Sequence, residues 1–196
     1  MTAPEGVAVH PRGLCESTTV GAGTRIWAFA HVLDGAVVGR DCNVCDGVFV
    51  EDGVVLGDRV TVKNGTLLFA GVRCEDDVFL GPGVVFTNDL RPRAAIRREG
   101  DALLTTTVRE GATLGAATVV VCGVEIGAHA FVGAGAVVTA PVPAHAFVVG
   151  NPARQRGWVC RCGHRLADDL VCPDCGTPHR LGPDGAMAAD PVGSRS

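Results

Sequence analysis

Residues 32–62 read V-LDGAVV-GRDCNV-CDGVFV-EDGVVL-GDRVTV, and an aliphatic residue closes every group of six. The same step of six continues on both sides of this stretch, from Val20 to Phe86 and again from Val108 to Ala144. Of the 19 positions in the two runs, 16 hold Val, Ile or Leu, although these three types make up only 47 of the 196 residues. The pattern is therefore an internal repeat, and such repeats indicate the architecture of the whole chain.

A second position of each hexad is also restricted. Four residues after the aliphatic position stands a small or β-branched residue in every hexad but one, where it is Leu90. Glycine often follows the aliphatic residue, as in Val38-Gly39 and Leu56-Gly57, and we expect it to supply the positive φ of a tight turn. This pattern predicts short parallel strands that stack, because no single rung can bury its apolar side alone. The predicted fold is an all-β parallel β-helix with three hexads per coil, four coils before the break and two and a third after it.

The repeat is interrupted after Phe86. Phe86 and Val108 are 22 residues apart, which is not a multiple of six, so a segment from about residue 91 to 107 must leave the stack. Four arginines fall within residues 91–98 of a chain whose net charge is -4. The segment is either a solvated surface loop or, as we favour, an anion-binding loop, because arginine pairs with phosphate and carboxylate in bidentate geometry.

Composition argues against several classes of protein. The net charge of -4 does not suit a general nucleic-acid-binding surface. Residues 1–10 lack the charged and apolar regions of a signal peptide, and no apolar run reaches the length of a membrane span. We therefore expect a cytoplasmic protein without nucleic-acid or membrane partners. In a reducing compartment its nine cysteines should be core residues, metal ligands or free thiols instead of disulfides.

Four of these cysteines form a metal-ligand pattern near the C-terminus. Cys160 and Cys162 make a C-x-C pair, Cys172 and Cys175 make a C-x2-C pair, and a glycine follows each pair. Four thiolates at such spacing predict a tetrahedral structural zinc, with a cluster of free thiols as the alternative. We expect a zinc-ribbon-like cap at residues 158–181 and a disordered tail at 182–196. A second C-x2-C pair, Cys42 and Cys45, lies within the repeat and is interpreted as packing.

Several motifs resemble those of the hexapeptide-repeat acyltransferases, in particular the branch that acetylates a 3-amino group on a UDP- or dTDP-linked sugar. The resemblance covers about residues 7–157. The segments that carry it are 23–31 (GTRIWAFAH), 62–64 (VKN), 75–83 (EDDVFLGPG), 86–90 (FTNDL), 111–115 (GATLG), 121–124 (VCGV) and 148–154 (VVGNPAR). The resemblance implies a left-handed β-helix over residues 1–157, acetyl-CoA as cosubstrate and a homotrimer with sites between subunits.

The same resemblance implies candidate site residues. Asn88 matches an asparagine beside the sugar amino group, and Asp89 is a weaker candidate for a base or a hydrogen-bond acceptor. Candidate substrate-binding residues are His31, Arg93, Arg97 and Arg98. Candidate contacts with coenzyme A are Gly133, Ala134, Gly135, Asn151 and Arg154. The implied reaction is direct attack of the amine on the thioester, so that the departing thiolate of coenzyme A can take the proton.

Three other functions remain as alternatives. Another acyl acceptor, a hydroxyl or a different amine, would use the same fold and donor. A non-catalytic trimeric scaffold would share the fold but not bind coenzyme A. A zinc hydratase would need three histidines converging on one metal, and the six histidines are scattered without a matching motif.

Overall fold

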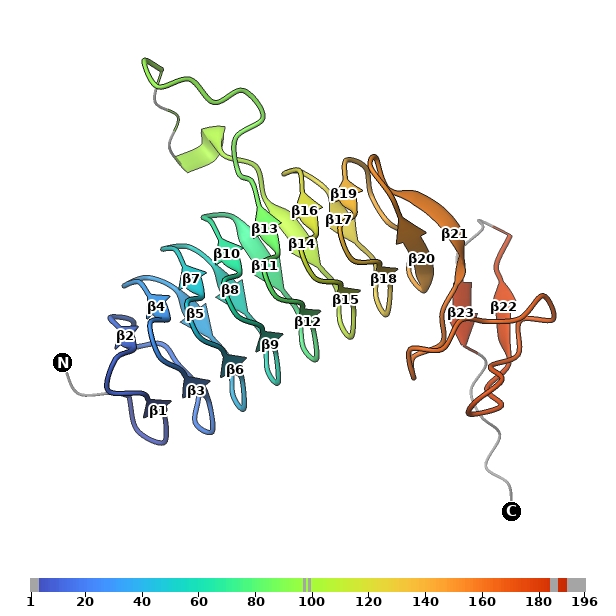
Figure 1. The fold of residues 1–196 in the computed structure, drawn as a ribbon, viewed down its shortest axis with the longest axis horizontal. Coiled ribbons are helices and arrows are strands. Elements are labelled where there is room, and N and C mark those ends of the chain that lie inside the picture. Colours follow the sequence, from blue (N-terminus) through green and yellow to red (C-terminus); the bar gives the residue numbers. More distant parts are fainter. Residues whose placement is uncertain (1–3, 97, 99, 184–186, 190–196) are drawn as a thin grey trace.

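The computed structural model describes residues 4–96, 98, 100–183 and 187–189 and shows a β-helix with an extruded loop and a C-terminal cap (Figure 1). Sheet 1 contains β1 (Ala8–Val9), β3 (Arg25–Ile26), β6 (Asn43–Val44), β9 (Thr61–Val62), β12 (Phe79–Leu80), β15 (Thr113–Leu114), β18 (Phe131–Val132), β20 (Ala146–Val149) and β21 (Arg154–Trp158). Sheet 2 contains β2 (Leu14–Cys15), β4 (His31–Val32), β7 (Phe49–Val50), β10 (Leu67–Leu68), β13 (Val85–Phe86), β16 (Val119–Val120) and β19 (Val137–Val138). Sheet 3 contains β5 (Val37–Val38), β8 (Val55–Leu56), β11 (Val72–Cys74), β14 (Thr106–Val108) and β17 (Glu125–Ile126).

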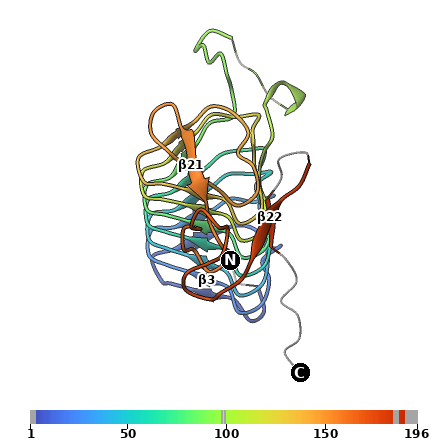
Figure 2. The same ribbon diagram turned by 90° about the vertical axis from the view of Figure 1, so that its right-hand side faces the viewer.

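The three sheets form the three faces of each coil, and neighbouring coils pair in parallel. Arg25 pairs with Asn43, and Asn43 with Thr61, so one coil takes 18 residues. Viewed along the stack, the coils superpose and the loop projects beyond them (Figure 2). The prediction of an all-β parallel β-helix built from hexads is confirmed. No helix formed by the described residues is long and apolar enough to cross a membrane.

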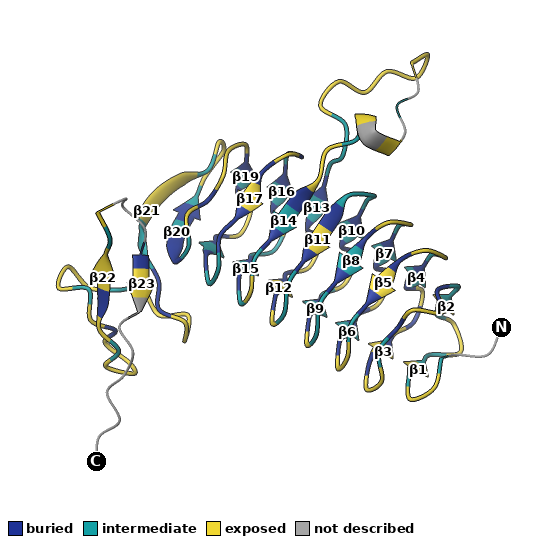
Figure 3. Ribbon diagram, turned by 180° about the vertical axis from the view of Figure 1, so that it is seen from behind, coloured by how far each residue is buried: buried dark blue, intermediate teal, exposed yellow. Residues whose placement is uncertain are grey.

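The core runs along the axis and consists of the two inward hexad positions. Val32, Val62 and Leu80 are fully buried at the aliphatic position, as are Val54 and Val84 at the small position (Figure 3). Burying each such side chain contributes about 1.5–3 kcal/mol, so stability accumulates rung by rung.

The glycines after the aliphatic position have a different role from the one expected. Gly39 and Gly57 are absent from the residues with positive φ, which are found two positions later, at Asp41 and Arg59. A Cβ on Gly39 would lie 2.3 Å from the carbonyl oxygen of Gly57 in the next rung. The glycine is therefore required by close stacking of the coils, and the expectation of a positive φ at this position was wrong.

The hexad step fails in the last coil. Val132 pairs with Val148, and Ile126 forms a parallel bridge with Val142, so this coil takes 16 residues instead of 18. Consequently Ala144, predicted as an inward aliphatic position, is only half-buried, while Ala146 is fully buried. The antiparallel strand β21 then covers β20 and ends sheet 1.

The extruded loop begins and ends earlier than predicted. The Leu104 N–H donates to the Asn88 carbonyl at 2.9 Å and joins the two ends of the loop, which we call its neck. Thr106 and Thr107 already belong to β14. Leu90, assigned to an inward position, is exposed because it lies beyond this neck. The loop contains the short 3-10 helix η1 (Gly100–Ala102).

The cap extends beyond the predicted boundary. It contains β22 (His179–Leu181), which pairs antiparallel with β23 (Met187–Ala189). The expectation of a disordered tail from residue 182 was therefore wrong for β23, because these residues continue a hairpin; residues 184–186 and 190–196 lie outside the described residues.

Candidate functional site

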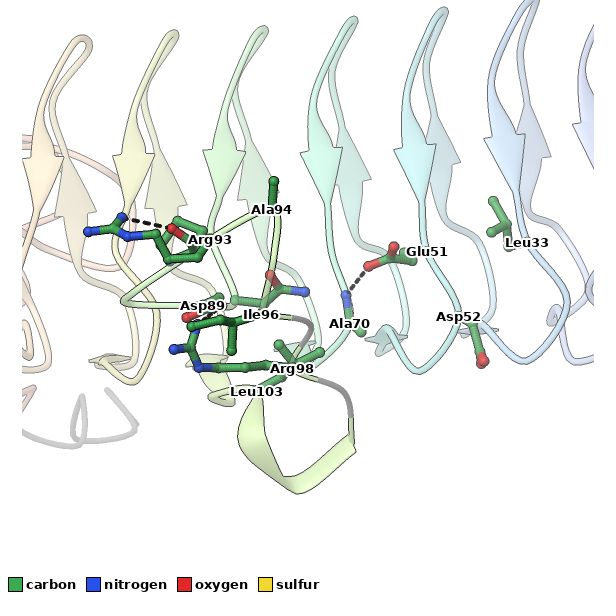
Figure 4. Close-up of a pocket in the computed structure, with 12 residues that line it drawn as sticks. Leu33, Glu51, Asp52, Ala70, Asp89, Arg93, Ala94, Ile96, Arg98 and Leu103 are labelled. Atoms are coloured by element: carbon green, nitrogen blue, oxygen red, sulfur yellow. Dashed lines mark hydrogen bonds and ion pairs between the residues drawn. The ribbon is translucent and has the colours of Figure 1, made fainter.

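A cleft of about 790 Å³ lies where the loop leaves the β-helix (Figure 4). One wall is the corner between sheets 2 and 3, and the other is the loop. The residues that line it are Leu33, Glu51, Asp52, Ala70, Asn88, Asp89, Pro92, Arg93, Ala94, Ile96, Arg98 and Leu103. The structure thus brings together Asn88, Asp89, Arg93 and Arg98 of the predicted site.

Asn88 is fixed by its backbone and free at its side chain. It follows β13, whose Phe86 is fully buried, and its carbonyl accepts the hydrogen bond from Leu104 that closes the loop neck. Its half-buried side-chain amide has no hydrogen-bond partner among the described residues. An amide held on a rigid coil and open to a cleft can orient a substrate amine or hydroxyl.

Asp89 is occupied in holding the loop. Its Oδ1 accepts from the Arg91 N–H at 2.7 Å, and its Oδ2 accepts from Arg98 Nη1 at 3.0 Å. The Arg91 backbone hydrogen bond, aided by the Arg98 guanidinium, holds the pKa of Asp89 below its usual range. A carboxylate that is ionised and paired in this way is poorly suited to act as a general base near neutral pH.

The loop arginines differ in how many hydrogen bonds their guanidinium groups make within the loop. Arg98 is tied to Asp89 and also donates to the Arg91 carbonyl, so its guanidinium is part of the loop framework. Arg93 is exposed, and the one hydrogen bond described for its guanidinium runs to the Pro92 carbonyl, at 2.9 Å. Arg93 is therefore the arginine of the cleft that can most readily reorient toward an anion. Arg97 lies outside the described residues.

His31 is near the cleft but does not line it. It lies on the outer face of sheet 2 with its ring edge-on to Phe49, 6.0 Å between centroids. Its Nε2 atom is 3.5 Å from Glu16 Oε1. This atom is buried and has no properly oriented hydrogen bond among the described residues. A contact with substrate on this face remains a prediction.

The candidates for binding coenzyme A lie in the last coils, away from the cleft. A Cβ on Gly133 would lie 2.6 Å from Val149 Cγ1, so close packing favours glycine there. Gly135 has a φ of +70°, a conformation that Ala117 also adopts one coil earlier. Ala134 and Asn151 are exposed. The exposed Arg154 donates from Nη1 to the Ala153 carbonyl at 2.8 Å. A ligand role for these residues stays a prediction.

Sequence analysis missed Glu51, Asp52, Ala70 and Leu33 as residues of the cleft. The coil length carries a signal for them, because positions separated by 18 form one column. Asp52 and Ala70 share the column of Asn88, and Leu33 and Glu51 lie in the neighbouring column of positions 33, 51, 69 and 87. The inward positions of the repeat define the core, and its outward columns define this wall of the cleft.

The four C-terminal cysteines converge in the cap. Their Sγ atoms lie within 4.8 Å of one another, with Cys160 3.5 Å from Cys175 and Cys162 3.4 Å from Cys172. A tetrahedral zinc with Zn–S bonds of about 2.3 Å places its sulfurs about 3.8 Å apart, so the donor set fits this ion. Hydrogen bonds with Thr177 lower the pKa of Cys175, whereas burial raises the pKa of Cys160.

The other C-x2-C pair has the packing role predicted for it. Cys42 and Cys45 are buried in the β-helix, 1% and 6% exposed. Cys42 Sγ lies 3.1 Å from the Gly57 carbonyl oxygen, and neither cysteine joins a metal-binding group among the described residues.

Comparisons with known proteins agree with this architecture. Residues 17–52 match the family model described as bacterial transferase hexapeptide (six repeats). The chain is 45% identical over 174 residues to dTDP-3-amino-3,6-dideoxy-alpha-D-galactopyranose 3-N-acetyltransferase of Aneurinibacillus thermoaerophilus, covering 88% of this chain and 90% of that enzyme.

Solved structures share the fold at lower identity. A hexapeptide-repeat acetyltransferase of Vibrio cholerae O1 biovar eltor, complexed with acetyl coenzyme A, is similar with a TM-score of 0.56 at 24% identity, over 64% of this chain and 72% of that one. The D94A mutant of an N-acyltransferase from Bacillus cereus, in complex with dTDP and coenzyme A, is similar with a TM-score of 0.54 at 17% identity, over 82% of this chain and 81% of that one.

The match at 45% identity extends over nearly the whole of both chains, and the hexapeptide family model matches part of the hexad repeat. The chain therefore belongs to the hexapeptide-repeat acyltransferases, in the branch of nucleotide-sugar N-acetyltransferases.

Proposed function

We propose that the protein transfers the acetyl group of acetyl-CoA to the 3-amino group of a dTDP-linked amino sugar. The observation that carries the proposal is the 45% identity, over 88% of this chain, to an enzyme named for that reaction. The cleft beside Asn88 supports it, because it combines a free amide with the exposed guanidinium of Arg93. A nucleotide-linked sugar presents a diphosphate, which arginine binds well.

In this proposal the residues of the chain position the two substrates. Asn88 accepts a hydrogen bond from the amine and directs its lone pair toward the thioester carbonyl carbon. As the C–N bond forms, backbone N–H groups stabilise the oxyanion; the C–S bond then breaks, and the departing thiolate takes the proton of the amine. Arg93 holds the diphosphate. The small residues Gly133, Ala134 and Gly135, with Asn151 and Arg154, would lie along pantetheine.

The proposal predicts thiol release from acetyl-CoA only with the right acceptor. We expect release with dTDP-3-amino-3,6-dideoxyhexoses at a kcat/KM at least about a hundredfold above that with the matching 3-hydroxy sugars, because a neutral amine is a much stronger nucleophile than a neutral hydroxyl. A thiol-release assay with dTDP- and UDP-linked amino sugars, with mass detection of the N-acetyl product, measures this. Preferential transfer to a hydroxyl would contradict the proposed acceptor, and no binding of coenzyme A would favour a scaffold.

We also propose that the cap holds one structural zinc ion through Cys160, Cys162, Cys172 and Cys175. The convergence of the four thiols within 4.8 Å supports this. A cap that buries so few apolar side chains needs the metal for its folding energy. We also propose that the enzyme acts in the cytoplasm, where reducing conditions keep thiols available as metal ligands.

We propose further that the protein is a homotrimer whose contacts involve sheet 2. Six of the outward residues of this sheet are apolar, Leu14, Phe49, Leu67, Val85, Val119 and Val137, and the seventh is His31, so the row is uninterrupted from Phe49 to Val137. The outward rows of sheets 1 and 3 are interrupted by polar or charged residues such as Arg25, Asn43 and Arg73. A contiguous apolar face of this kind is typical of an interface.

The proposed trimer predicts that a charge introduced on sheet 2 disrupts assembly. The wild-type chain should sediment as a trimer at micromolar concentration, and Val119→Arg should shift it toward monomer because three charges would be buried at the interface. Thr107→Arg, on the outer face of sheet 3 in the same coil, is the matched control and should remain trimeric. A wild-type monomer in analytical ultracentrifugation would contradict the assembly.

A further inference from the structure

Glu51 is a fixed carboxylate at the edge of an apolar face. It follows β7 and stands in one column between Leu33 and Phe69, with Phe69 packed 6.1 Å from Phe49 between ring centroids. Its Oε2 accepts a hydrogen bond from the Ala70 N–H at 2.7 Å (Figure 4). Its Oε1 has no hydrogen-bond partner among the described residues and is not buried, so one oxygen of this cleft-lining residue is anchored and the other is free.

Three acids line the cleft. Asp89 is bound by Arg98 at 3.0 Å, whereas Glu51 and Asp52 have no ion pair among the described residues. Within the part of the chain that the structure describes, no Lys, Arg or His forms an ion pair with Glu51. A half-buried carboxylate on an apolar face is costly unless hydrogen-bonded, so an oriented and incompletely satisfied one points to a ligand that donates to it.

The coil spacing places this carboxylate beside the proposed reaction centre. Asn88 lies one rung beyond Ala70, and stacked strands are about 4.8 Å apart. Because Oε2 is bonded to Ala70, the Glu51 carboxylate sits near the level of that rung, about one rung from Asn88. An amine held at Asn88 would thus have its neighbouring hydroxyl close to Glu51.

We propose that Glu51 is a specificity-determining residue, whose Oε1 accepts a hydrogen bond from the sugar hydroxyl adjacent to the reacting amine. The inference rests on the proposed function and adds to it the recognition of one ring substituent. In a 3-amino-3,6-dideoxyhexose the two free hydroxyls are at C2 and C4, and both flank the amine. Carboxylate recognition of one of them discriminates against sugars that lack it, since the charge would then face the cleft without a partner.

The test combines Glu51→Gln with deoxy acceptors. The glutamine carbonyl can keep the bond to Ala70, which leaves the amide NH₂ facing the substrate in place of an acceptor. We expect KM for the dTDP-3-amino-3,6-dideoxyhexose to rise roughly ten- to a hundredfold with kcat changed less than about threefold. With one of the two deoxy analogues, the 2-deoxy or the 4-deoxy sugar, wild type and variant should have the same KM. That analogue lacks the hydroxyl that Glu51 binds.

Asp34→Asn is the matched control. Asp34 occupies the preceding coil of the same corner, is exposed and does not line the cleft, so its variant should keep wild-type kinetics. An equal loss in Glu51→Gln with the parent sugar and both deoxy sugars would overturn the proposal, as would no loss at all or a loss that accompanies dissociation in ultracentrifugation. If wild type acetylates no amino sugar, the proposed function itself fails, which is a separate result.

Discussion

Asn88→Ala is expected to lower kcat/KM for the best amino-sugar acceptor by roughly ten- to a thousandfold, a loss of about 1.4 to 4 kcal/mol of transition-state stabilisation. The side chain lies where β13 ends and the cleft opens, and its amide has no partner among the described residues. Its backbone is held by the Leu104 hydrogen bond, which the substitution leaves in place. The loss should therefore come from poorer positioning of the amine, measured by steady-state kinetics on a correctly folded variant.

Two comparisons separate positioning from other causes. Coenzyme A affinity, measured calorimetrically, should hardly change, because the donor is proposed to lie along the later coils. Asp89→Asn removes the carboxylate and keeps the shape; since the pKa of Asp89 is lowered by Arg91 and Arg98, it is a poor base, and this variant should lose less than about tenfold. If Asn88→Ala keeps full activity, Asn88 is not the positioning residue. The reaction centre must then be sought near His31 or near His129, a half-buried residue of the turn before β18.

The fold was predictable because a hexad imposes the same requirement at every rung. Nearly every position assigned inward before the loop, from Val20 to Phe86, is buried. The prediction failed where the constraint changes. In the last coil the chain no longer has to match a following regular rung, so it shortens by two residues and Ala144 moves outward.

The candidate site was predictable only where local sequence carried the information. The break after Phe86 and the residues Asn88, Asp89, Arg93 and Arg98 pointed to the cleft that the structure shows. Which of these residues hold the loop and which are free to bind substrate depends on loop contacts, such as the hydrogen bond from Arg98 to Asp89. The repeat does not specify these contacts. Glu51 was missed for the opposite reason: its place is set by coil spacing, but its local sequence resembles any other turn of the β-helix.

The cap shows how a metal pattern can be evident while its surroundings are not. The spacing of the four cysteines predicted their convergence, which the structure shows. The hairpin of β22 and β23 was not foreseen, because its second strand lies in a sequence rich in Ala, Pro and Asp. Its contact with the β-helix includes His179, whose ring lies 5.5 Å from that of the buried His145.

Cys172→Ser should reduce bound zinc from about one ion per chain to nearly none. Cys172 is 1% exposed, so the serine would leave a buried hydroxyl that remains neutral and binds zinc poorly. Structural zinc contributes about 10–16 kcal/mol of binding energy in small zinc-binding peptides, far more than the apolar contacts of a cap this size. The cap should therefore unfold locally while the β-helix, whose core is separate, stays folded.

Three measurements on protein purified without added metal check this expectation. Elemental analysis gives the zinc content, hydrogen exchange reports the loss of protection in β22 and β23, and circular dichroism should still show the β-helix. Cys15→Ser is the control, because Cys15 lies in β2 at the opposite end of the molecule and should leave the zinc in place (Figure 1). Full zinc in Cys172→Ser, or none in the wild type, would contradict the assignment. Zinc loss with unchanged exchange in the cap would instead mean that the hairpin folds on its own contacts, so that the metal is bound without being needed for folding.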